Sequence, residues 1–329
     1  MTERLGVHLS QQLPTPDVVE VATLAEHLNY DRFFFSDHLV RDPFVVLTAC
    51  ARETERISLG TAVMPLYERH PLNAAVASAS LAHVSNGRFR FGIGTSHREM
   101  VEGQLGIPWR RPVTHLMEYI EVVRALHSGE EVSHKGEFYQ VDACLPFPPS
   151  EPVPIYLGPS GPTLFERAGA IADGVVLNWG PPDFLAERLR LLEKGRADAG
   201  RADDSVEIAC SLWCAVSNDP EQTQRLREDF RLLAGFFVQM SIYRKRFREL
   251  GLDDEMDAIE AILDREEDVG ANVSDSLVDA VSIIGDVDYC RARLDAYRDA
   301  GVGLPLVVPL TSEDGDMRPI RRTLEALAL

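Results

Sequence analysis

Short apolar runs alternate along the chain with longer segments in which apolar residues recur at helical spacing. In the first such segment, Val18, Val21, Ala22 and Ala25 fall on one helical face, the period expected of an amphipathic helix. The runs predict strands at residues 5–9, 31–36, 57–64, 88–95, 155–157, 175–178, 206–216 and 304–308. The intervening segments predict helices at 17–28, 43–53, 71–84, 113–126, 165–171, 183–199, 287–300 and 319–327. This alternation is typical of a parallel sheet covered by helices and predicts an α/β fold, a (β/α)8 TIM barrel.

Some segments break the alternation, and we interpret them as insertions in a single barrel domain that covers residues 1–329. The predicted insertions span about 97–112, 129–150 and 220–285. The second contains a small β excursion, and the third is a helical insertion before the last strand. Within the third, Phe236, Phe237 and Met240 are candidates for a subunit interface or for a lid over the site. The basic run 244–248 is predicted to form a solvated helix face.

Charge and cysteine content narrow the classes of partner. The chain carries 33 Lys and Arg against 52 Asp and Glu, a net charge of −19, which argues against nucleic acid and against an anionic membrane surface. No run approaches the ~18 apolar residues that a spanning helix needs, and the first residues contain no apolar signal region. The five cysteines are scattered, without a Cys-x-x-Cys pair. We therefore expect reduced thiols, no metal site and a cytoplasmic location.

The functional site of such a barrel lies where strands end and the following loops begin. The second predicted strand ends at Ser36, and Asp37 and His38 follow. An imidazole titrates near neutral pH, so His38 is a candidate acid–base group, with Asp37 orienting it or contacting a cofactor ring. The alternative is that Asp37 caps the next helix and His38 packs at the barrel rim.

The third and fourth strands end in small or polar residues. Thr61, Ala62 and Val63 close the third strand, where small side chains let a flat ligand approach the backbone; the alternative is a barrel layer that requires small residues. The fourth strand is followed by two small polar groups and a second imidazole. These candidates are Thr95, Ser96 and His97. Their alternative is a glycine-rich turn with a surface histidine.

The fifth strand leads into a loop of turn residues and then into a helix. The loop contains Gly158, Pro159, Ser160 and Gly161, and Pro162 suits a first helical position. Free backbone N–H groups at such a helix start can receive a phosphate. The alternative is a tight loop without a ligand.

Further candidates follow the sixth strand and occupy other loops of the same face. Asn178 and Trp179 end the sixth strand, and Trp179 is a candidate wall of a substrate pocket; the alternative is that it only packs against its neighbours. Arg69 is a candidate substrate-binding residue. It belongs to a set of basic residues on these loops that predicts an anion-binding rim on an acidic protein. The set comprises Arg69, His70, Arg98, Arg110 and Arg111. Solvated surface charge is the alternative.

As an ordered set, these stretches resemble the bacterial luciferase-like monooxygenase superfamily, most closely its branch of coenzyme F420 (deazaflavin) dependent oxidoreductases. The stretches that carry the resemblance are 32–38, 57–95, 134–139 and 154–174. The resemblance implies a flavin-type ring at the carboxyl ends of the strands and a non-proline cis peptide at Ala62–Val63. It also implies that Asp37 and His38 lie near the reactive face of the ring, that the loop 158–162 binds phosphate, and that the chain is a homodimer.

The expected activity is hydride transfer between F420 and a small organic substrate, with His38 or His97 as the acid–base group. Two departures from the sugar-phosphate dehydrogenases of this branch, His97 in place of a glutamate and Gly180 near the place of a lysine, argue against glucose 6-phosphate. One alternative function is an FMN-dependent monooxygenase that is fed by a separate reductase. Another is a flavin-binding barrel without catalytic activity.

Overall fold

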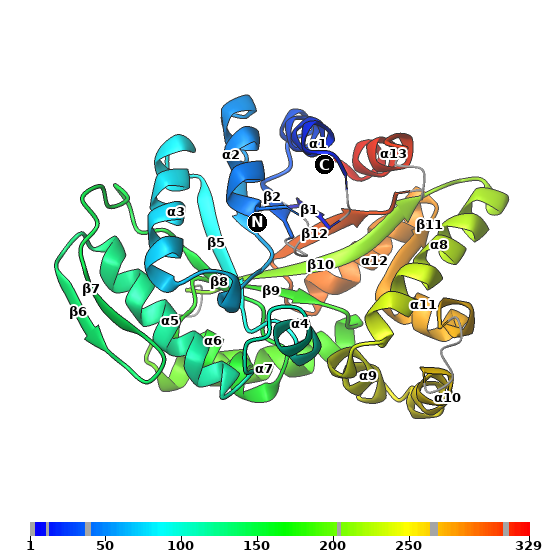
Figure 1. The fold of residues 1–329 in the computed structure, drawn as a ribbon. Helices are drawn as coiled ribbons and strands as arrows, with labels where there is room; N and C mark the ends of the chain where they lie inside the picture. Colours follow the sequence, from blue (N-terminus) through cyan, green and yellow to red (C-terminus); the bar gives the residue numbers. More distant parts are fainter. Residues whose placement is uncertain (1–3, 11–12, 37–40, 203–204, 264–268, 312–315) are drawn as a thin grey trace.

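Parallel strands close into a barrel in the computed structural model, which describes residues 4–10, 13–36, 41–202, 205–263, 269–311 and 316–329 (Figure 1). In order around the barrel, the eight strands of this described part are β1 (Gly6–Leu9), β2 (Arg32–Phe35), β3 (Ser58–Thr61), β5 (Phe89–Gly94), β8 (Ile155–Leu157), β9 (Gly174–Asn178), β10 (Glu207–Val216) and β12 (Leu304–Pro309). The pairing of β12 with β1 completes the closure. The predicted barrel is confirmed.

Helices surround the barrel on its outside (Figure 1). They are α1 (Thr15–His27), α2 (Pro43–Glu53), α3 (Pro71–Val84), α5 (Pro112–His127), α6 (Pro162–Ile171), α7 (Pro182–Asp198), α12 (Val287–Asp299) and α13 (Arg318–Leu327). Local chemistry fixes several of their starts. Asp42 accepts hydrogen bonds from Phe44 N and Val45 N at the start of α2, and Pro162 occupies the first turn of α6. Both are common ways to begin a helix.

The third predicted strand is interrupted. β3 ends at Thr61, the Ala62–Val63 peptide bond is cis, and the short β4 (Met64–Pro65) then pairs with β5. The cis bond predicted from the resemblance is therefore confirmed. The short 3₁₀ helix η1 (Leu66–Glu68) continues the chain towards α3.

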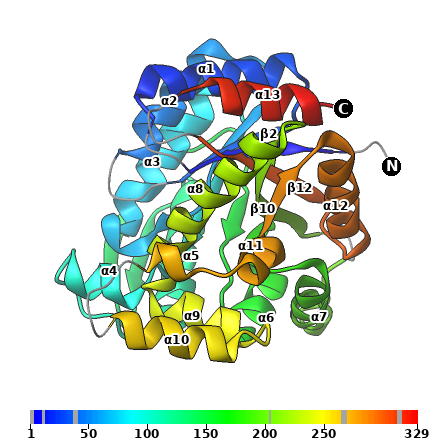
Figure 2. The same cartoon turned by 90° about the vertical axis from the view of Figure 1, so that its right-hand side faces the viewer.

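The additional elements lie near the predicted insertions. β6 (Val132–Lys135) and β7 (Gln140–Ala143) form an antiparallel hairpin. The helical insertion gathers at one side of the barrel (Figure 2). It consists of α8 (Pro220–Val238), α9 (Ser241–Arg248), α10 (Asp253–Leu263), η2 (Gly270–Asn272), α11 (Asp275–Val281) and β11 (Ser282–Gly285). The sequence did not predict α4 (Arg98–Gly103), α11 or β11, because each lies within a segment that was interpreted as an insertion.

Successive side chains along the barrel strands point alternately outward, towards the helices, and inward, into the barrel, and the two sets form separate buried clusters. Residues such as Val7, Phe33 and Leu59 face outward and pack against the helices in one large buried cluster. Inward-facing residues form a second, smaller buried cluster inside the barrel. This cluster comprises Phe34, Tyr156, Val176, Ala209, Leu304 and Leu306. Because the period of a strand is two, the residues above and below this layer also point into the barrel.

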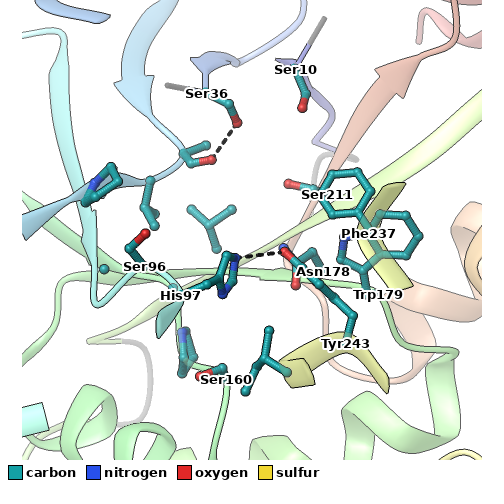
Figure 3. Close-up of a pocket in the computed structure, with 18 of the residues that line it drawn as sticks. Ser10, Ser36, Ser96, His97, Ser160, Asn178, Trp179, Ser211, Phe237 and Tyr243 are labelled. Carbon is teal, nitrogen blue, oxygen red and sulfur yellow. Dashed lines mark hydrogen bonds between the residues drawn. The ribbon is translucent and has the colours of Figure 1, made fainter. Parts of the chain in front are cut away.

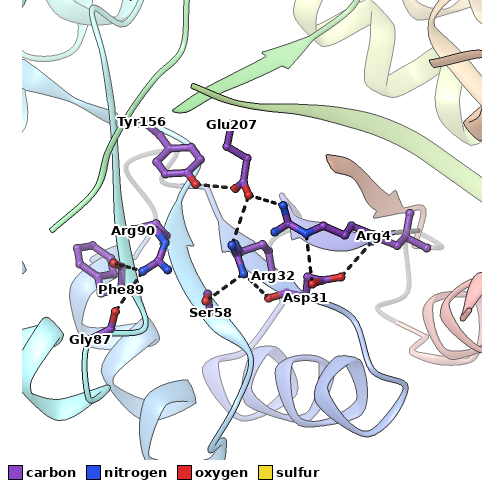
Figure 4. A network of polar contacts seen from close by, with 10 residues as sticks. Arg4, Asp31, Arg32, Ser58, Gly87, Phe89, Arg90, Tyr156 and Glu207 are labelled. Atoms are coloured by element: carbon purple, nitrogen blue, oxygen red, sulfur yellow. Dashed lines mark hydrogen bonds and ion pairs between the residues drawn. The ribbon is translucent and has the colours of Figure 1, made fainter. Parts of the chain in front are cut away.

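Charged residues close the amino-terminal end of the barrel (Figure 4). Glu207 accepts hydrogen bonds from Arg4 Nη1 at 2.6 Å, from Arg32 Nη2 at 3.4 Å and from the Tyr156 hydroxyl at 2.5 Å. Arg4 also pairs with Asp31 at 3.4 Å. Burial favours protonation of Glu207, but the Arg32 charge, the Tyr156 hydroxyl and Arg4 outweigh it and lower the pKa of this carboxyl. The layer is a network of ion pairs and hydrogen bonds centred on Glu207.

Candidate active site

A cavity opens at the carboxyl ends of the strands, and each of the eight barrel strands or the loop that follows it contributes to its wall (Figure 3). Residues from the strand ends that line it are His8, Ser10, Ser36, Ala62, Val63, Pro65, Gly94, Thr95, Ser96, His97, Gly158, Pro159, Ser160, Val176, Asn178, Trp179, Ser211, Trp213 and Val308. Met100 of α4 and Phe237, Ile242, Tyr243 and Arg246 of the helical insertion complete it. The helical insertion thus forms one wall of the cavity.

Most of the site residues predicted from the strand ends line this one cavity. They are Ala62, Val63, Thr95, Ser96, His97, Gly158, Pro159, Ser160, Asn178 and Trp179. Asp37 and His38 lie outside the described residues, and their roles stay predictions. Gly161 is not among the lining residues; it directly precedes α6 as the N-cap.

The interruption of the third strand shapes the cavity. Val63 projects between two glycines of neighbouring strand ends, since a Cβ atom on Gly94 or Gly158 would lie 2.8 or 2.9 Å from Val63 Cγ2. Real Cβ atoms do not approach so closely, so glycine at both positions allows Val63 to reach its place. The side chain thereby becomes part of the cavity surface.

Thr61 and Arg69 were predicted to bind a ligand, but in the structure both lie outside the cavity and contact protein groups. Thr61 is fully buried, and its hydroxyl donates to Gly92 O at 2.6 Å and accepts from Gly92 N at 2.9 Å. Arg69 pairs with Asp42 and lies over the Phe44 ring, 5.0 Å from its centroid. Neither residue lines the cavity. Thr61 links β3 to β5, and Arg69 braces the start of α2.

Two other arginines of the predicted rim also contact protein groups. Arg98 pairs with Glu102 and lies over the Trp109 ring, and Arg111 pairs with Glu137 at 2.5 Å. These arginines are exposed, and none of them lines the cavity. Surface ion pairs explain their positions without a bound anion.

Two contacts join the loop after β5 to the helical insertion. His97 Nε2 lies 3.3 Å from the Tyr243 hydroxyl, and the two rings meet edge to face with centroids 5.2 Å apart. Glu99 Oε1 accepts from both the backbone N and the hydroxyl of Ser241, at 3.1 and 2.6 Å. The start of α9 is therefore held against the start of α4, and His97 lies where they meet.

Arg246 corrects the prediction that the basic run 244–248 is a solvated helix face. Its side chain is buried and lines the cavity. It donates to Asn178 O at 3.1 Å and to Ser160 O at 3.0 Å. Burial lowers the pKa of this guanidinium, although the nearby Glu249 acts in the opposite direction. Arg246 links the loops after β8 and β9, whereas its neighbours Arg244 and Arg248 bind the surface residue Glu260.

Aromatic side chains form the wall beside Arg246. Trp179 stands at the centre of this wall, with a backbone φ of +53°. Its ring contacts those of Trp213, Phe237 and Tyr243, with centroids 6.0, 4.7 and 5.7 Å away. Phe237 and Met240 are buried, whereas Phe236 is 58% exposed. Within the predicted lid or interface, Phe237 thus faces the cavity and Phe236 faces outward.

Sequence reasoning missed a histidine on the first strand. His8 is 7% exposed and lines the cavity. Its Nδ1 lies 2.8 Å from Ser211 Oγ, and its Nε2 lies 2.5 Å from Ser36 Oγ. The signal was present in the alternation of Val7, His8 and Leu9, because a polar residue between outward apolar neighbours must point into the barrel.

The arrangement can bind a flat molecule between the strand ends and the aromatic wall, next to groups that exchange protons. No group of three or more His, Cys, Asp or Glu side chains is placed to hold a metal ion among the residues that the structure describes. Within the same residues, no helix has the length and apolar character needed to cross a membrane.

Comparison with known proteins agrees with this architecture. The chain is 30% identical over 302 residues to a 5,10-methylenetetrahydromethanopterin reductase of Methanolobus tindarius. The alignment covers 90% of this chain and 91% of that protein. It is 31% identical over 253 residues to an F420-dependent glucose-6-phosphate dehydrogenase of Nakamurella multipartita, with coverage of 72% and 74%.

A solved structure and a family profile extend the likeness to nearly the whole chain. The coenzyme F420 dependent tetrahydromethanopterin reductase of Methanopyrus kandleri matches with a TM-score of 0.86 at 23% identity, over 100% of this chain and 98% of that one. The profile described as luciferase-like monooxygenase matches residues 1–303. The chain belongs to the luciferase-like monooxygenase family.

Proposed function

We propose that this chain is an oxidoreductase that transfers a hydride between coenzyme F420 and a small organic substrate. The observation that carries the proposal is the single cavity built from all eight strand ends, with Val63 in its surface and imidazole and hydroxyl groups around it. Relatives whose names state F420 dependence support it, including a putative oxidoreductase of Mycobacterium tuberculosis that aligns with 94% of this chain.

The residues of the cavity fit a planar ring with an anionic tail. Gly94 and Gly158 leave the Val63 side chain in reach of a flat ligand. A Cβ atom at Gly161 would meet nothing within 4 Å, so the start of α6 is open. The α6 N-terminus and the nearby Arg246 guanidinium, which binds Ser160 O, favour negative charge at this end.

The residues of the chain would hold and orient F420 in this cavity. When bound, the deazaflavin supplies the two-electron hydride chemistry. Ala62 and Val63 would contact the ring, and the loop 158–161 would receive the phosphate. Other groups would hydrogen-bond the polar edges of the ring. These are Thr95, Ser96 and Asn178, together with Asp37 outside the described residues.

The aromatic wall defines the expected class of substrate. Trp179, Trp213, Phe237 and Tyr243 offer a largely apolar surface, which suits a flat or hydrophobic molecule. The segment after β9 contains Gly180, Pro181 and Pro182, the last at the start of α7, and none of them carries a positive charge for a sugar phosphate. We therefore propose a substrate other than glucose 6-phosphate.

We also propose that the protein acts as a homodimer in the cytoplasm. The exposed Phe236 side chain on α8 is a candidate contact between subunits. Light scattering on the purified protein tests the first point, and a monomer at micromolar concentration would contradict it. Replacement of Phe236 by Ser should weaken the dimer, whereas the same change at the exposed Phe147 should not.

A binding titration tests the cofactor. Purified protein is titrated with oxidised F420 and in parallel with FMN, and binding is followed by fluorescence. We expect tight binding of F420 and weak binding of FMN. The opposite result would contradict the proposal and would favour an oxygen-using flavoprotein.

A further inference from the structure

We propose that His8 and Ser211 form a proton relay that exchanges a proton with the substrate during hydride transfer. This inference rests on the proposed function and deepens it, because it assigns the proton to groups on β1 and β10. The relay consists of a hydrogen-bonded chain from Ser211 through the His8 ring to Ser36.

The directions of the hydrogen bonds fix the tautomer of His8. Ser36 has a single hydroxyl proton, and it donates this proton to Ala62 O at 2.7 Å (Figure 3). Ser36 Oγ must therefore accept from the ring, so Nε2 of the neutral His8 carries the proton. The other nitrogen, Nδ1, is then an acceptor, and Ser211 Oγ at 2.8 Å donates to it. The basic nitrogen of His8, Nδ1, thus faces Ser211.

The position of the hydrogen-bonded relay suits proton exchange with a ligand. His8, Ser36 and Ser211 all line the cavity. His8 belongs to a strand and is bound at both nitrogens, so its ring needs no rearrangement before it reacts. His97 differs, because it precedes α4 on a loop and its Nε2 lies 3.3 Å from Tyr243 at the helical insertion. The relay therefore occupies the rigid base of the site, and His97 occupies its wall.

The step balances for an alcohol and oxidised F420. The substrate O–H proton passes to Ser211 Oγ, while the Ser211 proton passes to His8 Nδ1. The C–H bond of the carbinol carbon breaks, and its hydride leaves for the deazaflavin. The alcohol is oxidised to a carbonyl compound, the cofactor is reduced by two electrons, and the resulting His8 imidazolium later releases one proton to solvent. Reduction of a carbonyl compound runs the same sequence backwards.

A spectroscopic test needs no substrate. Nitrogen-15 NMR of the imidazole rings in the intact protein, with His8→Gln as the assignment control, should show His8 as the Nε2–H tautomer when neutral. The Nδ1–H tautomer would overturn the relay, because Ser211 could then not donate to the ring.

Steady-state kinetics provide the second test. Oxidation is measured with oxidised F420 and a fixed panel of 2-propanol, cyclohexanol and benzyl alcohol. Reduction is measured with reduced F420 and cyclohexanone. His8→Gln and Ser211→Ala should each lower kcat by about a hundredfold or more, with the Kd for F420 changed less than threefold. The double variant should lose no more than the worse single variant, since both act in one relay.

The outcomes separate the relay from the proposed function. Wild-type kcat retained in His8→Gln, or losses that multiply in the double variant, would overturn the relay while F420 oxidoreduction stands. An absence of F420 binding by wild type would contradict the proposed function, and the tautomer of His8 would still decide the relay geometry. Circular dichroism and thermal unfolding of each variant identify any loss that comes from misfolding.

Discussion

At its amino-terminal end the barrel is closed by charged side chains that bind one another, whereas at its carboxyl end hydroxyl, amide and imidazole groups line a cavity. Glu207 is satisfied by Arg4, Arg32 and Tyr156. The opposite end holds Ser211 on the same strand, four residues later, at the cavity wall. One strand therefore contributes to a closed ion-pair layer and to a ligand site. The comparison teaches that polar side chains inside a barrel indicate a functional site only where they line a cavity that can hold a ligand.

The largest effect on stability is expected from a substitution in the charged layer at the amino-terminal end of the barrel. Glu207→Gln should lower the free energy of unfolding by about 3 kcal/mol, because Arg32 loses its compensating charge in a mostly buried layer and Arg4 keeps only its pair with Asp31. Urea denaturation measures the loss, and the Kd for F420 should not change. The control is Glu20→Gln, whose exposed pair with Arg321 should be worth less than about 1 kcal/mol. Equal effects of the two variants would contradict the assigned role.

The same carboxyl predicts a pH dependence. Its pKa is lower in the folded protein than the ordinary value of 4.5, so its contribution to stability is present above that value. It is lost as the pH falls through the folded pKa. The difference in unfolding free energy between wild type and Glu207→Gln should be constant from pH 6 to 7 and should shrink below about pH 4.5. A difference that grows on acidification would contradict this sign.

A smaller effect on stability is expected from Arg246→Met, at the carboxyl end of the barrel, where the cavity opens. Two carbonyl acceptors, Ser160 O and Asn178 O, lose their donor, so stability should fall by about 1–3 kcal/mol. The affinity for F420 should fall as well, because the loop after β8 loses its brace. Arg248→Met on the exposed side of the same helix is the matched control and should leave the affinity unchanged.

Thr61→Val tests whether a buried hydroxyl next to the site serves the ligand or the fold. Both of its hydrogen bonds go to Gly92, so we expect a stability loss of about 1–2 kcal/mol and an unchanged Kd for F420. A selective loss of F420 affinity at normal stability would instead restore the predicted role of Thr61 in cofactor binding.

The smallest effect is expected from Gly161→Asp. An aspartate at this N-cap stabilises α6 and has free space, but its charge should repel an anionic group at the helix start. We expect about a tenfold weaker binding of F420, or ~1.4 kcal/mol, at equal or higher thermal stability. Gly161→Asn supplies the same shape without the charge and should bind nearly as wild type does. Equal binding by both variants would place the phosphate elsewhere.

The fold was largely predictable because hydrophobic periodicity is a local signal. The bounds predicted for α2, α3 and β8 coincide with the structure. Elements that were missed, such as β11, lie within segments that we interpreted as insertions between barrel elements. The site was predictable only where turn residues follow strands. His8 was missed although its alternation with Val7 and Leu9 places it inside the barrel, because the sequence does not show that Ser36 and Ser211 lie beside it.

The sequence by itself determined the alternation of strands and helices, the acidic surface and the places where strands end in small or polar residues. Those properties depend on local spacing and composition. Only the tertiary structure decided that Thr61 bonds to Gly92, that Arg246 is buried against Ser160, and that His8 lies between Ser36 and Ser211. These contacts join residues that lie up to 203 positions apart in the chain. Barrel closure brings such residues together, and no local pattern records which strands become neighbours.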